Sequence, residues 1–314
     1  MFKEFKNLHD IYTAFPDNDS CRKHLEQLRW NGNPTCPHCG STTEPYKLKD
    51  GKTYECAEKK CRQKFTATVG TIFENTKVPL QKWFLAIYLA SSHKKGISSL
   101  QLHRDIGVTQ KTAWFMLHRI RLMLADKQPK MLSGVVEADE VYIGGVLKNK
   151  HKWQRDQYKI DGIDTKQPVL GILQRDGKIK FIHLKEVNRK VLIGKLKHYV
   201  KQGSVVITDS LPAYKSLKGH FEHHSVHHAH GEYARGIYHT NSIEGAFSLL
   251  QRGVIGIYHF VSPKHLHRYC SEFAFRYNTR KSDESERFNT VLSQVAGRLK
   301  YQDLINSPNV PPRS

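Results

Sequence analysis

The sequence predicts a mixed α/β domain in the C-terminal half of the chain, preceded by a cysteine-rich segment and a helical segment. Three observations carry this prediction. Short β-like runs alternate with helical patterns from Gly134 onward, four cysteines cluster between residues 36 and 61, and apolar residues recur at helical spacing between residues 79 and 126. With 314 residues, the chain has room for two or three domains.

The chain is strongly basic, with 50 Lys and Arg against 29 Asp and Glu and a net charge of +21. This excess favours a polyanionic partner, most often nucleic acid, although an enzyme for acidic substrates or a membrane-surface protein stays open. The start of the sequence has no apolar signal-peptide core, and the apolar run 83–90 is far shorter than the roughly 20 residues of a membrane helix. The clustered cysteines indicate metal binding in a reducing compartment, so we expect a cytoplasmic protein that does not enter membranes.

We expect five segments along the chain. They are a helical lead, a zinc ribbon, a helix-turn-helix-like region, the mixed α/β domain and a frayed C-terminal tail, at residues 1–30, 31–72, 73–132, 133–282 and 283–314. In the α/β domain, the patterns predict strands at 135–143 and 204–208, a hairpin around Asp176-Gly177, and helices at 189–201, 241–252 and 263–280.

The four clustered cysteines are spaced as two pairs. Two residues separate Cys36 from Cys39, and four separate Cys56 from Cys61. Two thiolate pairs on separate turns can close a tetrahedron around Zn²⁺ with bonds of about 2.3 Å, so the spacing predicts a structural zinc ribbon. Unligated thiols or a redox pair are the alternative. Because ribbons bind DNA, RNA and protein alike, the spacing indicates a metal rather than a function.

Residues 97–114 read as a helix, a glycine-containing turn and a second helix, which is the pattern of a helix-turn-helix. Thr109 is placed to cap the second helix, whose N-terminal end is where base and phosphate contacts are made. The candidates for DNA contacts are Gln110, Lys111, Thr112, Arg119 and Arg121. A helical linker whose basic face is merely solvated is the alternative.

Several acidic residues interrupt apolar runs, where an unpaired charge is costly. Glu137 and Asp139 share one face of the first expected strand, and Glu140 points the other way. Asp209 ends a second apolar run, and Glu244 follows 35 residues later at the start of a helix. Three carboxylates that meet in an α/β domain can hold two Mg²⁺ ions, which activate one oxygen and stabilise another in phosphoryl transfer.

Each of these acids also has a purely structural interpretation. Asp139 would pair with a neighbouring lysine, and Asp209 would cap the turn before Pro212. Glu244 and Asn241 have the spacing of a capping box, with Asn241 at the cap and Glu244 as the third helical residue. The combination with a zinc ribbon and a basic chain favours metal-dependent catalysis.

Together these motifs resemble an insertion-sequence transposase of the ISXO type, which joins an N-terminal zinc ribbon to a DDE catalytic domain of RNase H-like fold. The resemblance covers about residues 15–280. It rests on the ribbon cysteines, Glu137-Ala138-Asp139-Glu140 with Gly144-Gly145, Thr208-Asp209, the block 239–245 and the blocks 265–269 and 272–278.

The resemblance implies that Asp139 and Asp209 are the first two ligands of a catalytic Mg²⁺ or Mn²⁺ site. The third position varies among Asn, His and Glu in this family, so Asn241 and Glu244 are rivals one helical turn apart. We favour Glu244, because a carboxylate binds Mg²⁺ better than an amide does and because the 35-residue interval suits DDE enzymes. Where the family tends to have a lysine, this chain has Gln251, and Arg252 is the candidate for the missing phosphate contact.

Six histidines crowd one segment: His220, His223, His224, His227, His228 and His230. We expect a loop or edge strand near the active site, with some histidines facing DNA phosphates, in preference to a second metal site.

The resemblance thus implies a prokaryotic, nucleoid-associated transposase. It would bind the terminal inverted repeats of its element as at least a dimer, free the 3′ ends by metal-dependent cleavage and transfer them into target DNA. The alternative is a catalytically inactive zinc-ribbon DNA-binding protein, a regulator or a domesticated transposase, which Gln251 motivates. A nuclease that cuts without joining is a third hypothesis.

Overall fold

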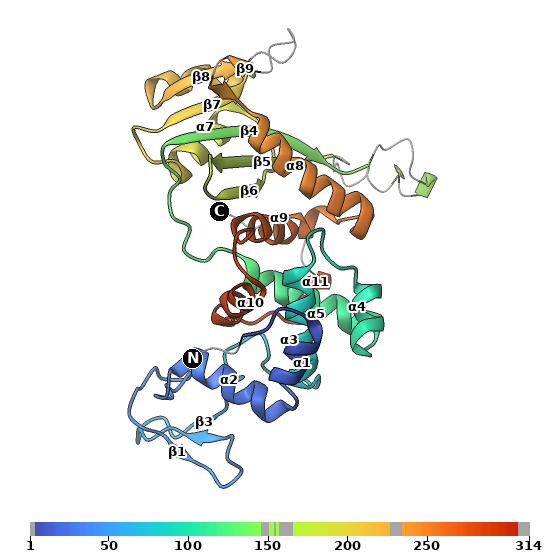
Figure 1. Ribbon diagram of the computed structural model, residues 1–314. Helices are drawn as coiled ribbons and strands as arrows, with labels where there is room; N and C mark the ends of the chain where they lie inside the picture. Colours follow the sequence, from blue (N-terminus) through green and yellow to red (C-terminus); the bar gives the residue numbers. More distant parts are fainter. Residues whose placement is uncertain are drawn as a thin grey trace. The chain divides into compact units, whose positions relative to one another are not determined.

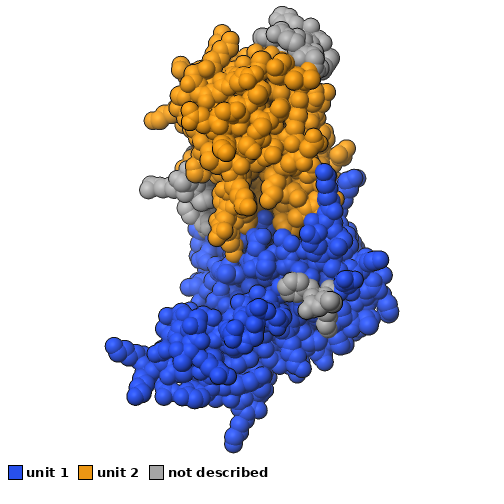
Figure 2. Space-filling view, turned by 60° about the vertical axis from the view of Figure 1, so that its left-hand side comes forward, with its two compact units in different colours: residues 1–124, 281–306 blue, residues 125–280, 307–314 orange. Residues whose placement is uncertain are grey.

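The structure is a computed structural model that describes residues 4–145, 151–153, 155–156, 166–226, 234–235 and 237–306. The chain folds as two compact units, coloured separately in Figure 2, which comprise residues 1–124 with 281–306 and residues 125–280 with 307–314. Within the described ranges, no helix is long and apolar enough to cross a membrane.

The first unit combines a small antiparallel sheet with a group of helices. The sheet has the order β1 (Tyr46–Lys47), β2 (Tyr54–Glu55) and β3 (Lys64–Phe65). The helices are α1 (Leu8–Ala14), α2 (Asn18–Trp30), α3 (Leu80–Ser92), α4 (Ser99–Ile106), α5 (Gln110–Leu124), α10 (Glu284–Ser293) and α11 (Tyr301–Asn306). Edge-to-face ring contacts join Phe15 to Phe84 and Phe84 to Phe288, so the core links segments from both ends of the chain.

The expected C-terminal tail is wrong for residues 284–306. The carboxylate of Asp283 accepts the backbone N–H of Glu286 at 2.7 Å and so caps α10. Helix α10 then buries Phe288, Val291 and Leu292 completely in the first unit. The spacing of these three residues is that of an apolar helix face and could have predicted α10, but most of the surrounding residues are polar. Residues 307–314 lie outside the described residues.

The second unit is built around a mixed five-stranded sheet, which confirms the predicted α/β fold and is consistent with an RNase H-like domain. The strand order is β6–β5–β4–β7–β8, antiparallel from β6 to β4 and parallel from β4 to β8. The strands are β4 (Val135–Ile143), β5 (Gln167–Gln174), β6 (Ile179–His183), β7 (Val205–Asp209) and β8 (Glu222–Val226). A separate two-stranded pair, β9 (Ala234–Arg235) and β10 (Tyr238–His239), precedes the next helix.

Helices cover both faces of the large sheet (Figure 1). One face carries α7 (Arg189–Tyr199) and the 3₁₀ helix η2 (Pro212–Gly219), and the other carries α8 (Asn241–Gly253), the π-helical η4 (Val254–Tyr258) and α9 (Pro263–Asn278). Successive residues of β4 alternate between the two cores, because a strand directs its side chains to opposite faces. Val136 and Ala138 pack towards α7, whereas Val141 and Ile143 pack towards α8.

Gly171 allows α8 to lie close to the sheet. It is the partner of Asp139 in the β4–β5 pairing, and a Cβ added to it would stand 2.7 Å from Phe247 and 2.8 Å from Ile243. We predict that Gly171→Ala displaces α8 and lowers the free energy of unfolding by about 1–3 kcal/mol, the usual cost of overpacking a core.

Gly194→Ala is the matched control for Gly171→Ala. Gly194 lies within α7 and has open space around an added Cβ, so alanine there should raise the unfolding free energy by up to about 1 kcal/mol. Denaturant unfolding measures both changes. Equal stability of Gly171→Ala and the wild type would contradict the close packing of α8.

Candidate functional site

Asp139 and Asp209 meet where the parallel pairing of β4 and β7 ends, with Asp139 in the middle of β4 and Asp209 as the last residue of β7. Strands β4 and β7 pair in parallel up to Ala138 and Thr208, and the aspartates are the next residues on each strand. Glu140 completes the group, because one oxygen from each of the three carboxylates lies within 4.8 Å of the others. The parallel pairing therefore brings together acids that are far apart in the sequence.

Glu140 is a residue of this group that sequence reasoning left out. It accepts a hydrogen bond from the hydroxyl of the buried Tyr214 in η2, on the face of the sheet opposite Glu137. Burial, followed by the charges of Asp209 and Asp139, raises the pKa of Glu140 to about 7, although the Tyr214 hydrogen bond acts in the opposite sense. The position of Glu140 directly after Asp139 in the sequence could have indicated that it belongs to the acidic group.

Backbone groups orient the two aspartates. Oδ1 of Asp139 accepts the N–H of Glu140 at 2.8 Å, and Oδ1 of Asp209 accepts the N–H of Leu211 at 3.1 Å. Asp209 therefore also closes the turn before Pro212, as its structural interpretation required. Three crowded carboxylates form an all-oxygen donor set of the kind that Mg²⁺ and Mn²⁺ prefer, so the group fits a divalent cation.

Glu244 lies outside this close group, and both Asn241 and Glu244 are exposed in the first turn of α8. Oε1 of Glu244 accepts a hydrogen bond from the hydroxyl of the buried Thr240 at 3.2 Å. The capping-box interpretation is wrong, because Thr240 is the N-cap and Asn241 already belongs to the helix. The N–H of Ile243 is capped from β4 instead, by Oε2 of Glu137 at 3.0 Å.

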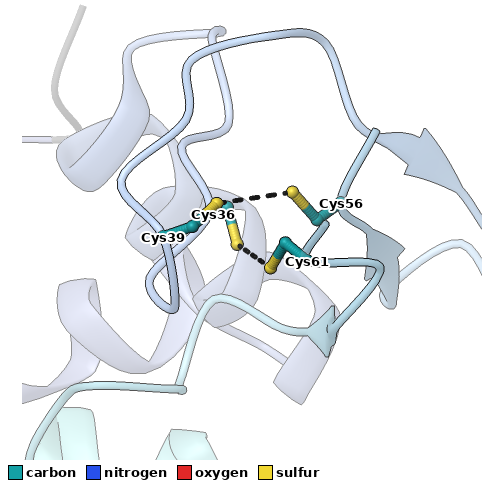
Figure 3. A group of neighbouring side chains, drawn as sticks. All are labelled: Cys36, Cys39, Cys56 and Cys61. Atoms are coloured by element: carbon teal, nitrogen blue, oxygen red, sulfur yellow. Dashed lines mark hydrogen bonds between the residues drawn. The ribbon is translucent and has the colours of Figure 1, made fainter. Parts of the chain in front are cut away.

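The four cysteines form a second group, in the first unit, and their sulfur atoms converge from two separate turns (Figure 3). The Sγ–Sγ distance is 3.8 Å between Cys36 and Cys61 and 3.6 Å between Cys39 and Cys56. A tetrahedron of sulfur atoms about 2.3 Å from Zn²⁺ has edges of about 3.8 Å. The donors and their spacing therefore fit zinc.

Helices α4 and α5 are joined by a short turn that contains Gly107, in the order that the sequence predicts for residues 97–114. Oγ1 of Thr109 accepts the N–H of Thr112 at 3.2 Å, so Thr109 caps α5 as predicted. Gln110 and Lys111 are exposed at this end of α5, and Thr112 is partly exposed. The Lys111 ammonium lies 4.9 Å from the centre of the Tyr301 ring of α11.

The expectation that Arg119 and Arg121 contact DNA is wrong for this structure. The two residues are only 7% and 3% exposed. Arg119 donates from Nη1 to the carbonyl of Ile72 at 2.6 Å and from Nε to the carbonyl of Leu299 at 3.1 Å. Its guanidinium thus ties α5 to two distant backbone segments of the first unit. Arg252, by contrast, is exposed in the last turn of α8.

Three of the six histidines, His227, His228 and His230, lie outside the described residues. His223 is in the edge strand β8, where its Nε2 is 3.0 Å from the hydroxyl of Thr208, and burial lowers the pKa of its side chain to about 4. His224 stacks on Tyr238 with 3.8 Å between ring centroids. Neither metal-binding group found among the described residues includes a histidine.

Comparison with known proteins identifies both parts of the chain. Residues 131–278 match the ISXO2-like transposase domain, and residues 16–64 match the transposase zinc-ribbon domain. A protein of Halobacterium salinarum, described as an uncharacterized protein in transposable element ISH50, is 29% identical over 282 residues, which are 85% of this chain and 93% of that relative. The three acids fall within the first match and the four cysteines within the second. Both matches confirm the resemblance to insertion-sequence transposases of the ISXO type, since residues 16–64 match their zinc ribbon and residues 131–278 match their DDE domain.

Proposed function

We propose that this transposase cuts the 3′ ends of its element and transfers them into target DNA. The observation that carries the proposal is the meeting of Asp139, in the middle of β4, with Asp209, at the end of β7, and with Glu140 beside them. Two Mg²⁺ or Mn²⁺ ions bound there would activate the attacking oxygen and stabilise the leaving oxygen. Water and then the freed 3′-hydroxyl would be the attacking groups, so no serine or tyrosine nucleophile is required.

Asp139 and Asp209 would hold the metal from the sheet, and Glu244 would add a third carboxylate from α8. The start of α8 supports this choice, because Ile243 is bonded to β4 through Glu137 and lies against Gly171, the partner of Asp139. Glu140 and Asn241 are the rivals for the third position. Glu140 belongs to the close acidic group, and Asn241 offers a neutral oxygen one turn before Glu244.

The first unit would recognise the terminal inverted repeats through the zinc-bound ribbon and α5, while Arg252 of the second unit would contact a phosphate. Gln110, Lys111 and Thr112 lie at the N-terminal end of α5, the end at which such helices contact DNA. Because both ends of an element must be cut, we propose at least a dimer on DNA. The protein would act at the nucleoid in the prokaryotic cytoplasm.

Lys111→Ala is predicted to weaken the binding of DNA, and to weaken it equally for the element's ends and for unrelated DNA sequences. Loss of one phosphate contact should reduce the slope of log affinity against log salt by about 1. Fluorescence anisotropy at several salt concentrations measures this slope. Lys218→Ala, at an exposed lysine of η2 in the second unit, is the control. An unchanged slope for Lys111→Ala would remove Lys111 from the DNA-binding residues.

An in vitro reaction with labelled ends and a supercoiled target tests the proposed function through its products. Ends joined to the target are expected when the zinc-loaded protein is given Mg²⁺ or Mn²⁺. Cut ends that are never joined would instead indicate a nuclease.

A catalytically inactive DNA-binding protein is the second candidate, and Gln251 favours it. Gln251 is exposed in the last turn of α8, beside Arg252, where the family tends to have a lysine. This candidate predicts tight binding of the ends without cutting under either metal. Joining that appears only after Gln251→Lys would identify the lost lysine as the cause.

A further inference from the structure

Glu137 and Arg175 form an ion pair that the proposed chemistry does not use. Glu137 lies on β4 two residues before Asp139 and is completely buried, and Arg175 directly follows β5. Nε of Arg175 donates to Oε1 of Glu137 at 2.7 Å. A buried carboxylate is costly unless its oxygens are paired, so Glu137 needs the bond from Arg175 to remain buried and charged.

The same two side chains hold the segment that leads into α8. Nη1 of Arg175 donates to the carbonyl of Ile237 at 2.6 Å, and Nη2 donates to the carbonyl of His239 at 2.9 Å. On the other side of the pair, Oε2 of Glu137 accepts the N–H of Ile243. In addition, Nδ1 of His239 lies 3.6 Å from Oε1 of Glu137. Four contacts beyond the Glu137–Arg175 ion pair therefore join the central sheet to residues 237–243.

The Glu137 contact replaces a local helix cap. The first N–H groups of a helix lack partners within the helix, and a carboxylate at that end is also favoured by the helix dipole. The N-cap residue Thr240 gives no side-chain cap and bonds to Glu244 instead. Consequently the start of α8 is fixed by β4, a strand about a hundred residues earlier in the sequence.

We propose that Glu137 and Arg175 are positioning residues for the metal site. Glu137 stands on the strand and face that carry Asp139, and the residue it caps, Ile243, directly precedes Glu244. The pair therefore sets where Glu244 lies relative to Asp139. This proposal rests on the proposed function and on Glu244 as a metal ligand.

Arginine is suited to this position because its guanidinium directs several N–H groups in one plane. Arg175 uses three nitrogens on three acceptors, in Glu137, Ile237 and His239. A lysine keeps the charge but has a single nitrogen and cannot reproduce this fork. Arg175→Lys thus keeps the positive charge beside Glu137 but loses the hydrogen bonds that position residues 237–239.

The test compares Arg175→Lys and Glu137→Gln with a matched control, Arg276→Lys. Arg276 pairs with Glu272 within α9 of the same unit, and both side chains of that pair are only 4% exposed. Mn²⁺ binding to the full-length, zinc-loaded protein is measured by electron paramagnetic resonance, with the thermal midpoint of each variant as the measure of stability. Hydrogen exchange of the amides at the start of α8 reports its anchoring.

We expect Arg175→Lys and Glu137→Gln to raise the Kd for Mn²⁺ by about 10–100-fold, the usual effect of losing a group that orients a metal ligand. Exchange at the start of α8 should accelerate in both. Arg276→Lys should lower the thermal midpoint without changing the Kd. Should one of the first two variants fail to fold, the other carries the comparison.

Equal Mn²⁺ affinity in Arg175→Lys, Glu137→Gln and Arg276→Lys would overturn the proposal and leave the pair a purely structural role. Failure of the proposed function has a different signature. In that case Asp139→Asn and Asp209→Asn would leave the Mn²⁺ affinity of the protein unchanged.

Discussion

Asp139→Asn is expected to abolish strand transfer while leaving the fold and the binding of DNA ends intact. Metal stabilisation of transition-state charge is worth several kcal/mol, so the rate should fall by about a thousandfold or more. The amide oxygen of asparagine can still accept the N–H of Glu140, which Asp139 accepts at 2.8 Å. The loss should therefore appear in the rate of joining and not in the thermal midpoint.

Asp126→Asn is the control for this prediction. Asp126 belongs to the same unit, and its side chain is 53% exposed and pairs with Lys180 at 3.3 Å. Because water screens the exposed carboxylate of Asp126, loss of its charge should cost little stability, so this variant should join ends at the wild-type rate. Wild-type joining by Asp139→Asn would refute the assignment of Asp139 as a metal ligand.

Removal of zinc is expected to unfold the ribbon and to abolish binding of the element's ends. Structural Zn²⁺ contributes about 10–16 kcal/mol of apparent binding free energy in small zinc domains. The strands of the ribbon have two residues each, and its core depends on the ring contacts among Trp30, Tyr54 and Phe65. So small a sheet gains too little from burial to stay folded without its metal.

A chelator and Cys56→Ser test the zinc prediction in parallel. Zinc content by mass spectrometry, proteolysis within residues 31–72 and anisotropy with labelled ends are the measurements. Cys21→Ala is the control, because Cys21 is a buried thiol of α2 outside the cluster. If Cys56→Ser keeps its zinc and binds ends as the wild type does, the four-cysteine site is wrong.

Local patterns predicted the elements that position the acids. Asp209 ends an apolar run, Asp139 lies within a strand that Glu137 interrupts, and the parallel pairing of β4 and β7 brings the two aspartates together. Glu140 escaped this reasoning because alternation along a strand places it on the opposite face from Asp139. At the end of the β4–β7 pairing, the three side chains nevertheless converge, since the group lies at the end of the ladder and not on one face.

Contacts between segments that are distant in the sequence could not be predicted from the sequence. Arg119 reads as a DNA contact because it is a cation on a basic helix, yet its acceptors lie at residues 72 and 299. Glu137 reads as an acid without a partner, yet Arg175 and the start of α8 surround it. No periodicity or spacing reports such partners, because only the tertiary fold brings them together.

Strand transfer by the wild type and by Asp209→Asn, measured side by side, tests the proposed metal-dependent transposition most directly. Labelled ends, a supercoiled target and either Mg²⁺ or Mn²⁺ complete the reaction. We expect joined products for the wild type under at least one metal and none for Asp209→Asn, with equal binding of the ends by both proteins. Joined products from Asp209→Asn, or tight binding by the wild type without any cut or joined DNA, would contradict the proposed function.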